Sequence, residues 1–370
     1  MIYDSFMPAR IFSGAGCLRA HADALLPLGK KCLIVTGGSS AKKSGALFDA
    51  SAVLDELKIE YGVFDKIGEN PLTRSCHDAG AAARGLGAEF IIGIGGGSPL
   101  DAAKAVAIYA SNEELSPSDI YLRKYKNAPL PVVLIGTTSG TGSEVTGVSV
   151  LTNSDTGYKK SISGPDCYSV ISFCDYKYTC SMPMSVTVST ALDAFCHASE
   201  SFFASSSNEI SSLYAKKALE LVFPYLKSFD ENCSLPDDRG RELLYEASIF
   251  AGLAINITGT CFPHTVGYIL TEDYGIPHGR ACAAFSRDFL KICGEYKPRE
   301  SEEFYKILNS NPEAVANICD RLADVSASMT GEQAGIYAER WRGGIKNFDR
   351  TPGSFTADTA LEILKKYVSD

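Results

Sequence analysis

The residues best suited to chemistry lie in the second half of the chain, where one acid and three histidines could share a metal ion. Asp193 and His197 are four residues apart, so on a helix both side chains face the same way, about one turn apart. His264 and His278 can supply the other half of such a site. Imidazole and carboxylate suit iron(II), zinc, manganese or nickel. The four residues therefore predict a divalent metal site, although a single histidine or an isolated Asp/His pair is more often structural.

A second group of residues has the composition of a phosphate-binding turn. An apolar run at 90–94 leads into GGGSPLD at 95–101, which is a strand, a glycine-rich turn and the start of a helix. This arrangement presents unpaired backbone N–H groups and the positive end of a helix dipole to a phosphate. The spacing is neither the GxGxxG dinucleotide fingerprint nor a Walker loop, and a tight turn with a helix cap is the structural alternative. The expected cofactor contacts here are Gly96, Gly97, Ser98 and Asp101.

The segment 136–144 is a second candidate phosphate-binding turn, and it follows another predicted strand. It reads GTTSGTGSE, and its hydroxyls can hydrogen-bond ribose or phosphate oxygens. Taken alone, it could equally be a plain loop. Two such turns at the carboxyl ends of strands fit the rule that open α/β sheets bind ligands there. The expected contacts are Thr137, Thr138, Thr141 and Ser143.

Two kinds of element must position these residues. Residues 1–182 alternate short β-branched runs with helical stretches, as βαβ units do, with strands expected at 31–36, 60–64, 90–94, 131–135, 145–151 and 169–173. After Pro183 the strand signals disappear, and apolar residues recur at helical spacing through 187–205, 210–229, 240–256, 286–294, 312–330 and 357–368. The sequence therefore predicts an α/β, Rossmann-like, parallel-sheet dinucleotide-binding domain over 1–182, followed by an all-α helical bundle over 183–370 that carries the metal and the substrate.

Composition limits the class of partner. Of the 370 residues, 45% are hydrophobic and 21% charged, which is ordinary globular usage. A net charge of −9 without a basic block argues against nucleic acid, and no apolar run is long enough for a transmembrane helix. The acidic Asp4 and the absence of basic residues leading into a long apolar stretch argue against a secretory signal. The twelve cysteines are scattered and contain no CxxC pair, which favours reduced thiols. A cytoplasmic protein with reduced thiols and a small-molecule partner is expected.

The chain resembles the iron-containing alcohol dehydrogenase family over nearly its full length. The stretches that carry the resemblance are GGGSPLDAAK at 95–104, GTGSE at 140–144, DAFCH at 193–197 and PHG at 277–279. His264 and His278, fourteen residues apart, match the spacing of the last two metal ligands of the family. The resemblance implies that Asp193, His197, His264 and His278 bind Fe²⁺, Zn²⁺ or another divalent metal. It also implies a homodimer or larger homo-oligomer.

The same resemblance implies two further cofactor residues, and the chain departs from the family pattern at one position. Asn70 falls where the family has an Asn-Pro pair at the cofactor, and Lys159 matches a family lysine beside the cofactor phosphates, with a solvated lysine as the alternative. Family members often have another histidine four residues after the third ligand, where this chain has Tyr268. Because a phenol can donate or accept a proton in a relay, Tyr268 is a candidate for proton transfer, equally consistent with packing. Ribose hydroxyls or water are the other routes.

The choice between the two nicotinamide cofactors depends on the turn after the strand at 31–36. An acid there would hydrogen-bond a ribose 2′-hydroxyl and repel a 2′-phosphate, but residues 37–43 read GGSSAKK. The small residues leave room, Ser39 and Ser40 offer donors, and Lys43 adds positive charge. Family members with a similar stretch favour the phosphorylated cofactor, so NADP is expected over NAD, with a helix cap and exposed lysines as the alternative.

The expected function is a metal-dependent alcohol dehydrogenase or aldehyde reductase that acts on a small alcohol or aldehyde with NAD(P)H, the metal serving as Lewis acid. A dehydroquinate-synthase-like cyclase, which is a lyase, has a similar architecture and is the second hypothesis. Such an enzyme would crowd basic residues around a phosphorylated substrate, whereas the segment between the last two histidines has Glu272 and Asp273 and no Lys or Arg before Arg280. A non-catalytic binding protein on the same fold is the third.

Overall fold

The computed structural model of the protein describes residues 5–369, so Asp4 lies outside the described residues. By contact between residues the chain divides into two compact units. The sheet unit comprises Phe6–Met182 and Asp237–Tyr245, and the helical unit comprises Pro183–Pro236 and the chain from Glu246 onward. The division of the chain at residues 182 and 183 stays a prediction, and the segment Asp237–Tyr245 groups by contact with the sheet unit.

Parallel strands form the centre of the sheet unit. Over residues 5–369, six of them pair in the order β1-β8-β5-β4-β2-β3, all parallel. Their bounds are β1 Arg10–Ser13, β2 Lys31–Gly37, β3 Glu60–Ile67, β4 Phe90–Gly95, β5 Val132–Gly136 and β8 Ile171–Cys174. A separate antiparallel pair consists of β6 (Val148–Thr152) and β7 (Lys159–Ser163). The expected α/β fold class with a parallel sheet is therefore confirmed, although β1 and β7 are absent from the sequence prediction.

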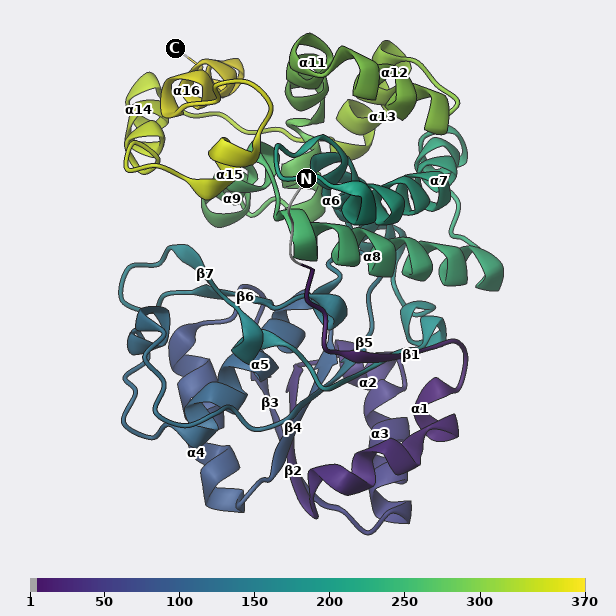
Figure 1. Ribbon diagram of the computed structural model, residues 1–370, viewed down its shortest axis with the longest axis vertical. Helices are drawn as coiled ribbons and strands as arrows, with labels where there is room; N and C mark the ends of the chain where they lie inside the picture. The colour runs from purple at the N-terminus through teal and green to yellow at the C-terminus, as the bar shows by residue number, and fades with distance from the viewer. Residues whose placement is uncertain (1–4, 370) are drawn as a thin grey trace. The chain divides into compact units, whose positions relative to one another are not determined.

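Helices cover both faces of this sheet, which is why its central strands are almost wholly apolar. Figure 1 shows α4 and α5 on one side of the sheet and α1 and α3 on the other, and two apolar clusters fill the layers between. The bounds are α1 Cys17–Ala20, α2 Ser40–Lys43, α3 Ala46–Glu56, α4 Thr73–Leu86 and α5 Gly97–Ser111. A Cβ added at Gly93 would lie 2.6 Å from Ala103 Cβ, so this glycine permits the close approach of α5 to β4.

The helical unit is built around α6, whose residues are buried along most of its length. Its aromatic side chains pack on α12, with the Phe203 and Phe304 ring centroids 5.0 Å apart. The helices from here to the C-terminal end are α6 Met184–Phe203, α7 Glu209–Asn232, α8 Asp238–Thr258, α9 Phe262–Tyr274, α10 His278–Ala283, α11 Ser286–Tyr296, α12 Pro298–Ile307, α13 Pro312–Ala323, α14 Gly331–Glu339, α15 Lys346–Arg350 and α16 Ala357–Leu364. Because α6 is enclosed by the others, polar side chains on it are removed from water.

Short 3₁₀ turns lie at Ala22–Leu28, Asp119–Leu122, Ser143–Val145, Pro165–Cys167, Tyr176–Thr179 and Lys365–Tyr367. Among the described helices, none is by itself long and apolar enough to cross a membrane. The pair Asp238–Thr258 and Phe262–Tyr274, bent by 112°, meets the same criterion of length and composition when taken together.

Candidate functional site

Helix α6 carries the first two predicted metal ligands on one face. Asp193 and His197 are 3% and 5% exposed, and His197 Nε2 lies 3.8 Å from Asp193 Oδ1. The spacing of four residues in a helix produces this contact. Burial of a carboxylate and an imidazole side by side is costly unless a partner compensates the charge. The helix therefore presents a preformed half-site.

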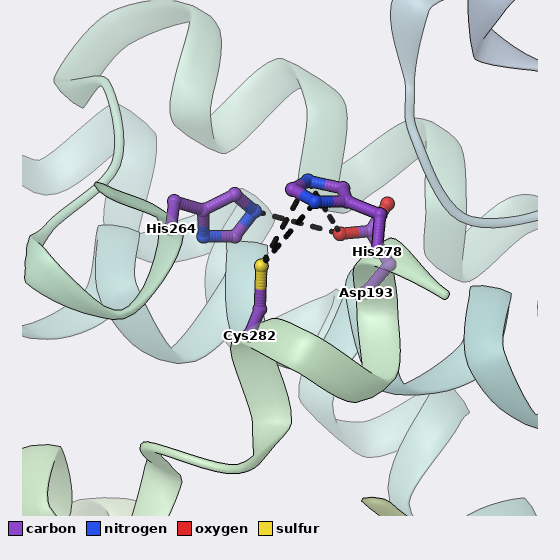
Figure 2. A group of neighbouring side chains, drawn as sticks. All are labelled: Asp193, His264, His278 and Cys282. Carbon is purple, nitrogen blue, oxygen red and sulfur yellow. Dashed lines mark hydrogen bonds and ion pairs between the residues drawn. The ribbon is translucent and has the colours of Figure 1, made fainter. Parts of the chain in front are cut away.

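The other two histidines come from α9 and α10, and all three imidazoles converge on one oxygen of Asp193. His264 Nε2 lies 3.4 Å and His278 Nε2 lies 3.9 Å from Asp193 Oδ1 (Figure 2). The His197 and His264 rings stack with centroids 4.4 Å apart. Three of these four side chains are almost completely buried, whereas the His278 side chain is 32% exposed. Any opening of this cluster to small molecules is therefore on the side of His278.

Two glycines make the convergence possible because they let helix backbones touch. A Cβ added at Gly279, next to His278, would lie 1.8 Å from the carbonyl oxygen of Ser189 on α6. A Cβ at Gly267 on α9 would lie 3.1 Å from the backbone of Ala281 and Cys282 on α10. Real Cβ atoms do not approach backbone as closely as 1.8 Å, so the contact of α10 with α6 requires glycine at 279, and the 3.1 Å contact at Gly267 would become tight with any side chain there. The PHG motif thus positions His278 against Asp193.

The distances suit a shared cation. Donors at the corners of a tetrahedron with bonds of about 2.1 Å are about 3.4 Å apart. Asp193 Oδ1 and His264 Nε2 are also buried atoms with no hydrogen-bond partner among the described residues. An unsatisfied buried polar group costs roughly 1–3 kcal/mol, and a metal bound between the two atoms would satisfy both. The residues present therefore fit a divalent cation.

A second carboxylate orients His264. Glu200 Oε1 lies 2.6 Å from His264 Nδ1, and Glu200 Oε2 accepts a hydrogen bond of 2.6 Å from the backbone N–H of Cys261. A carboxylate on Nδ1 fixes the tautomer that leaves Nε2 available for a metal. Sequence reasoning missed Glu200, although its position seven residues after Asp193, on the same helix face, could have indicated it.

The pKa values of the clustered side chains are shifted mainly by burial and by one another, because the side chains lie close together. Burial by itself would raise the pKa of Asp193, but His197, His264 and His278 reverse this and hold the pKa below its usual range. Burial likewise opposes protonation of His264, yet Cys282 and Glu200 raise the pKa of this imidazole well above its ordinary value. The carboxylates of Asp193 and Glu200 beside the imidazole likewise favour a metal cation in the place of a proton.

Tyr268 lies beside the cluster. Its ring stacks on His278, with centroids 5.5 Å apart and planes at 19°. The stack explains why an aromatic residue suits this position on α9, one turn after His264. It places the side chain next to the most exposed of the four predicted ligands.

The two glycine-rich turns leave the sheet side by side because β4 and β5 are neighbours, with Gly95 opposite Gly136. They also pack on each other: a Cβ at Gly96 would lie 3.1 Å from Thr138 Cγ2, and one at Gly97 would lie 2.8 Å from Thr141 Cγ2. The absence of side chains at these glycines therefore lets the two turns pack closely on each other. Ser98 lies in the first turn of α5, and Thr137 Oγ1 is buried without a hydrogen-bond partner among the described residues.

Asp101 and Ser143 belong to a buried network that joins the second turn and β6 to α5. Ser143 Oγ donates to Asp101 Oδ1 at 2.6 Å, and the Val150 N–H donates to Asp101 Oδ2 at 2.9 Å. Lys104, fully buried, donates to Ser143 Oγ at 2.9 Å and to the Thr146 carbonyl at 3.0 Å. Burial raises the pKa of Asp101 and lowers that of Lys104. This network gives both predicted cofactor residues a positioning role within the unit.

The remaining predicted cofactor residues also lie in the sheet unit. Ser39, Ser40 and Lys43 are exposed after the carboxyl end of β2, beside Lys42, which pairs with Asp65 at 3.1 Å. Asn70 follows β3 with φ of 54°, a left-handed conformation that asparagine tolerates. Lys159 begins β7, in the separate antiparallel pair. The structure therefore gathers four of the five groups at the carboxyl ends of neighbouring strands and places Lys159 on another element.

Comparison with known proteins gives a consistent result. Residues 8–176 match the family model described as iron-containing alcohol dehydrogenase, and residues 187–340 match the model for the C-terminal part of the Fe-containing alcohol dehydrogenase family. The chain is 32% identical over 332 residues to a sulfoacetaldehyde reductase of Bilophila wadsworthia. The aligned region covers 88% of this chain and 84% of the reductase.

Solved structures agree over almost the full length. An iron-containing alcohol dehydrogenase from Thermotoga maritima is 33% identical, with a TM-score of 0.91 and coverage of 99% of both chains. A sulfoacetaldehyde reductase from Bifidobacterium kashiwanohense, solved in complex with NAD⁺, is 27% identical, with a TM-score of 0.85 and 99% coverage of both chains.

Proposed function

The chain belongs to the iron-containing alcohol dehydrogenase family and is an oxidoreductase, and we propose that it interconverts a small aldehyde and the corresponding alcohol with NADP(H). The observation that carries this proposal is the convergence of three imidazole Nε2 atoms, 3.4–3.9 Å from one buried carboxylate oxygen. The helical unit carries the metal and the substrate in this proposal, and the sheet unit carries the dinucleotide.

Asp193, His197, His264 and His278 are the proposed ligands of Fe²⁺, Zn²⁺ or another divalent cation. When bound, the cation supplies Lewis acidity toward a substrate oxygen. Glu200 holds the ring of His264, and the exposed side of His278 is where a small substrate can enter. Burial of the other three side chains limits access of water.

The proposed dinucleotide site lies at the carboxyl ends of β2 to β5. The N–H groups at the start of α5, with the hydroxyls of the second turn, are suited to pyrophosphate. Ser39, Ser40 and Lys43 would receive a 2′-phosphate, and Lys43 has no ion-pair partner among residues 5–369. We expect higher kcat/KM with NADPH than with NADH, and a strong preference for NADH would reject this assignment.

Tyr268 is the proposed proton carrier beside the substrate. Its stacking on His278 keeps the phenol close to the open side of the cluster. A hydroxyl there can pass a proton between the alcohol oxygen and solvent, which is the role that general acid–base catalysis requires.

A single variant tests the metal assignment. His264→Ala removes one donor and the partner of Glu200, so bound metal and aldehyde-dependent loss of NADPH absorbance are expected to disappear together. The assay uses short aldehydes, with sulfoacetaldehyde included because a relative is named for it. His77→Ala, which changes a histidine of the sheet unit, is the matched control and should retain both. Turnover by metal-free His264→Ala protein would contradict the proposal.

We also propose a homodimer, which light scattering on the metal-loaded protein would measure directly. The assignment to this family of oxidoreductases replaces the lyase and the non-catalytic binding protein as hypotheses.

A further inference from the structure

The donor cluster contains a sulfur atom in addition to the four proposed ligands. Asp193, His264, His278 and Cys282 offer one donor atom each, and these atoms all lie within 4.8 Å of one another. Building on the metal centre of the proposed function, we propose that Cys282 is a further protein donor, which binds thiophilic cations such as Zn²⁺ or Co²⁺ through Sγ.

The position of this sulfur is fixed by the short helix α10. His278 and Cys282 are four residues apart on it, and Sγ lies 3.8 Å from His278 Nε2. Figure 2 shows the thiol pointing into the space between His264 and His278. Donors bound to a common ion at about 2.1 Å for nitrogen and 2.3 Å for sulfur would be about 3.6 Å apart. Cys282 thus needs only a small adjustment to join the ligand set.

A second observation points to a ligand at this place. Asp193 Oδ1 and His264 Nε2, both on residues only 3% exposed, face the same space and have no hydrogen-bond partner among the described residues. Native proteins seldom leave two such atoms unsatisfied side by side. A cation held between the carboxylate, the imidazoles and the sulfur satisfies them.

Other buried thiols of the helical unit have different surroundings. Cys196, adjacent to His197 on α6, has its Sγ 3.7 Å from Ser286 Oγ, and Cys319 on α13 is fully buried. Among the described residues, Cys282 is the cysteine that belongs to a group of potential metal donors. The proposal therefore concerns this position and not thiols in general.

The chemistry of the bond defines what the sulfur would change. As the sulfur–metal bond forms, the thiol loses its proton to solvent, so binding releases one proton more than the carboxylate and imidazoles require. Thiolate donors favour soft and borderline cations over hard ones such as Mn²⁺ or Mg²⁺. Cys282 is thus expected to bias the centre toward Zn²⁺ and Co²⁺.

Cobalt gives a direct readout that does not depend on turnover. The full-length protein loaded with one Co²⁺ per chain should show a near-ultraviolet sulfur-to-cobalt charge-transfer band. Cys282→Ser should still bind Co²⁺ but lose this band, and its affinity for Zn²⁺ should fall by about tenfold or more relative to its affinity for Mn²⁺. Cys319→Ser, the control for removal of a buried thiol, should keep both the band and the affinities.

The outcomes separate this proposal from the one on which it rests. Stoichiometric Co²⁺ without the band in the wild-type protein, or a band that persists in Cys282→Ser, overturns the role of Cys282 and leaves the carboxylate–histidine centre intact. Failure of the wild-type protein and of Cys282→Ser to bind any divalent cation overturns both proposals. Loss of the band in Cys282→Ser with retained Co²⁺ supports the sulfur ligand.

Discussion

His264 is held at one edge of its ring and, among the described residues, lacks a hydrogen bond at the other, so the same side chain is both fixed in orientation and unsatisfied. Its Nδ1 lies 2.6 Å from Glu200, whereas its Nε2 lies 3.4 Å from Asp193 and has no hydrogen-bond partner in the described part of the chain. A ring whose orientation is already fixed loses little conformational entropy when it binds a cation. The orienting carboxylate should therefore control the affinity of the centre for metal.

Removal of the charge on Glu200 should weaken metal binding without unfolding the protein. We expect Glu200→Gln to lower the affinity for Zn²⁺ by about tenfold and Glu200→Leu by about a hundredfold, because glutamine still accepts a hydrogen bond and leucine does not. Competition with a chelator of known affinity measures both changes.

Glu144→Gln is the matched control for this pair. It alters another buried carboxylate, which accepts a hydrogen bond of 2.9 Å from Tyr245 in the sheet unit, and it should leave the affinity for metal unchanged. Equal loss of affinity in all three variants would show that Glu200 acts only through general stability.

The phenol of Tyr268 offers a second test at the scale of one residue. Tyr268→Phe keeps the ring that stacks on His278 but removes the hydroxyl. If the hydroxyl carries the proton, kcat should fall by about 10²-fold while bound metal stays constant, and the pH dependence of kcat should change. Unchanged kcat with an unchanged pH profile would assign Tyr268 to packing alone.

At the scale of elements, glycines decide which helices can touch. Gly279 allows α10 to lie directly on the backbone of α6, and Gly267 allows α9 to lie on α10. The three helices supply all the proposed ligands, so their spacing sets the distances between donor atoms. A methyl group added at Gly279, the tightest of these contacts, should therefore weaken metal binding although Gly279 is not itself a ligand.

Gly279→Ala tests this relation. The added Cβ would lie 1.8 Å from the Ser189 carbonyl oxygen, so α10 must shift, and we expect a loss of about 1–3 kcal/mol in the free energy of unfolding together with weaker metal binding. Gly294→Ala, in α11 with nothing within 4 Å of the added Cβ, should leave the affinity unchanged and raise stability by about 0.5–1 kcal/mol. Denaturant unfolding and chelator competition measure the two effects, and equal behaviour of both variants would contradict the relation.

At the scale of the whole molecule, a cation bound by α6, α9 and α10 links α6 to the neighbouring helices α9 and α10, which lie far from α6 in the sequence. A ligand that binds only the folded state stabilises it by about 2.7 kcal/mol when its free concentration is 100 times Kd. Removal of metal with a chelator should therefore lower the melting temperature of the wild-type protein, and added Zn²⁺ should restore it. The His264→Ala variant should respond to neither treatment, and an identical response of variant and wild type would place the metal effect elsewhere.

Much of the architecture could be predicted from local patterns. The apolar runs predicted at 31–36 and 90–94 are β2 and β4, and the helical patterns predicted at 187–205 and 210–229 are α6 and α7. These elements could be predicted because a strand buried on both faces needs a continuous apolar run, and a helix buried on one face needs apolar residues at helical spacing. The strands β1 and β7 were missed, since RIFS is short and lies at the edge of the sheet while KKSIS is mostly polar. Helices α9, α10, α12, α14 and α15 were missed as well, and residues 324–330, expected to be helical, lie beyond the end of α13.

The sequence by itself determined which groups could bind a metal or a phosphate. These are a carboxylate and an imidazole spaced to share one helix face, two further imidazoles, and the glycine-rich turns after buried strands. Only the tertiary structure decided which groups meet. Glu200 joins the cluster because α6 meets α9, where its carboxylate contacts His264, and Cys282 joins it because α10 packs on α6 and α9 through glycines. In both cases α6 meets a segment that is far from it in the sequence. Spacing along a chain encodes which side chains share a local face, whereas the distance between two helices depends on every side chain packed between them.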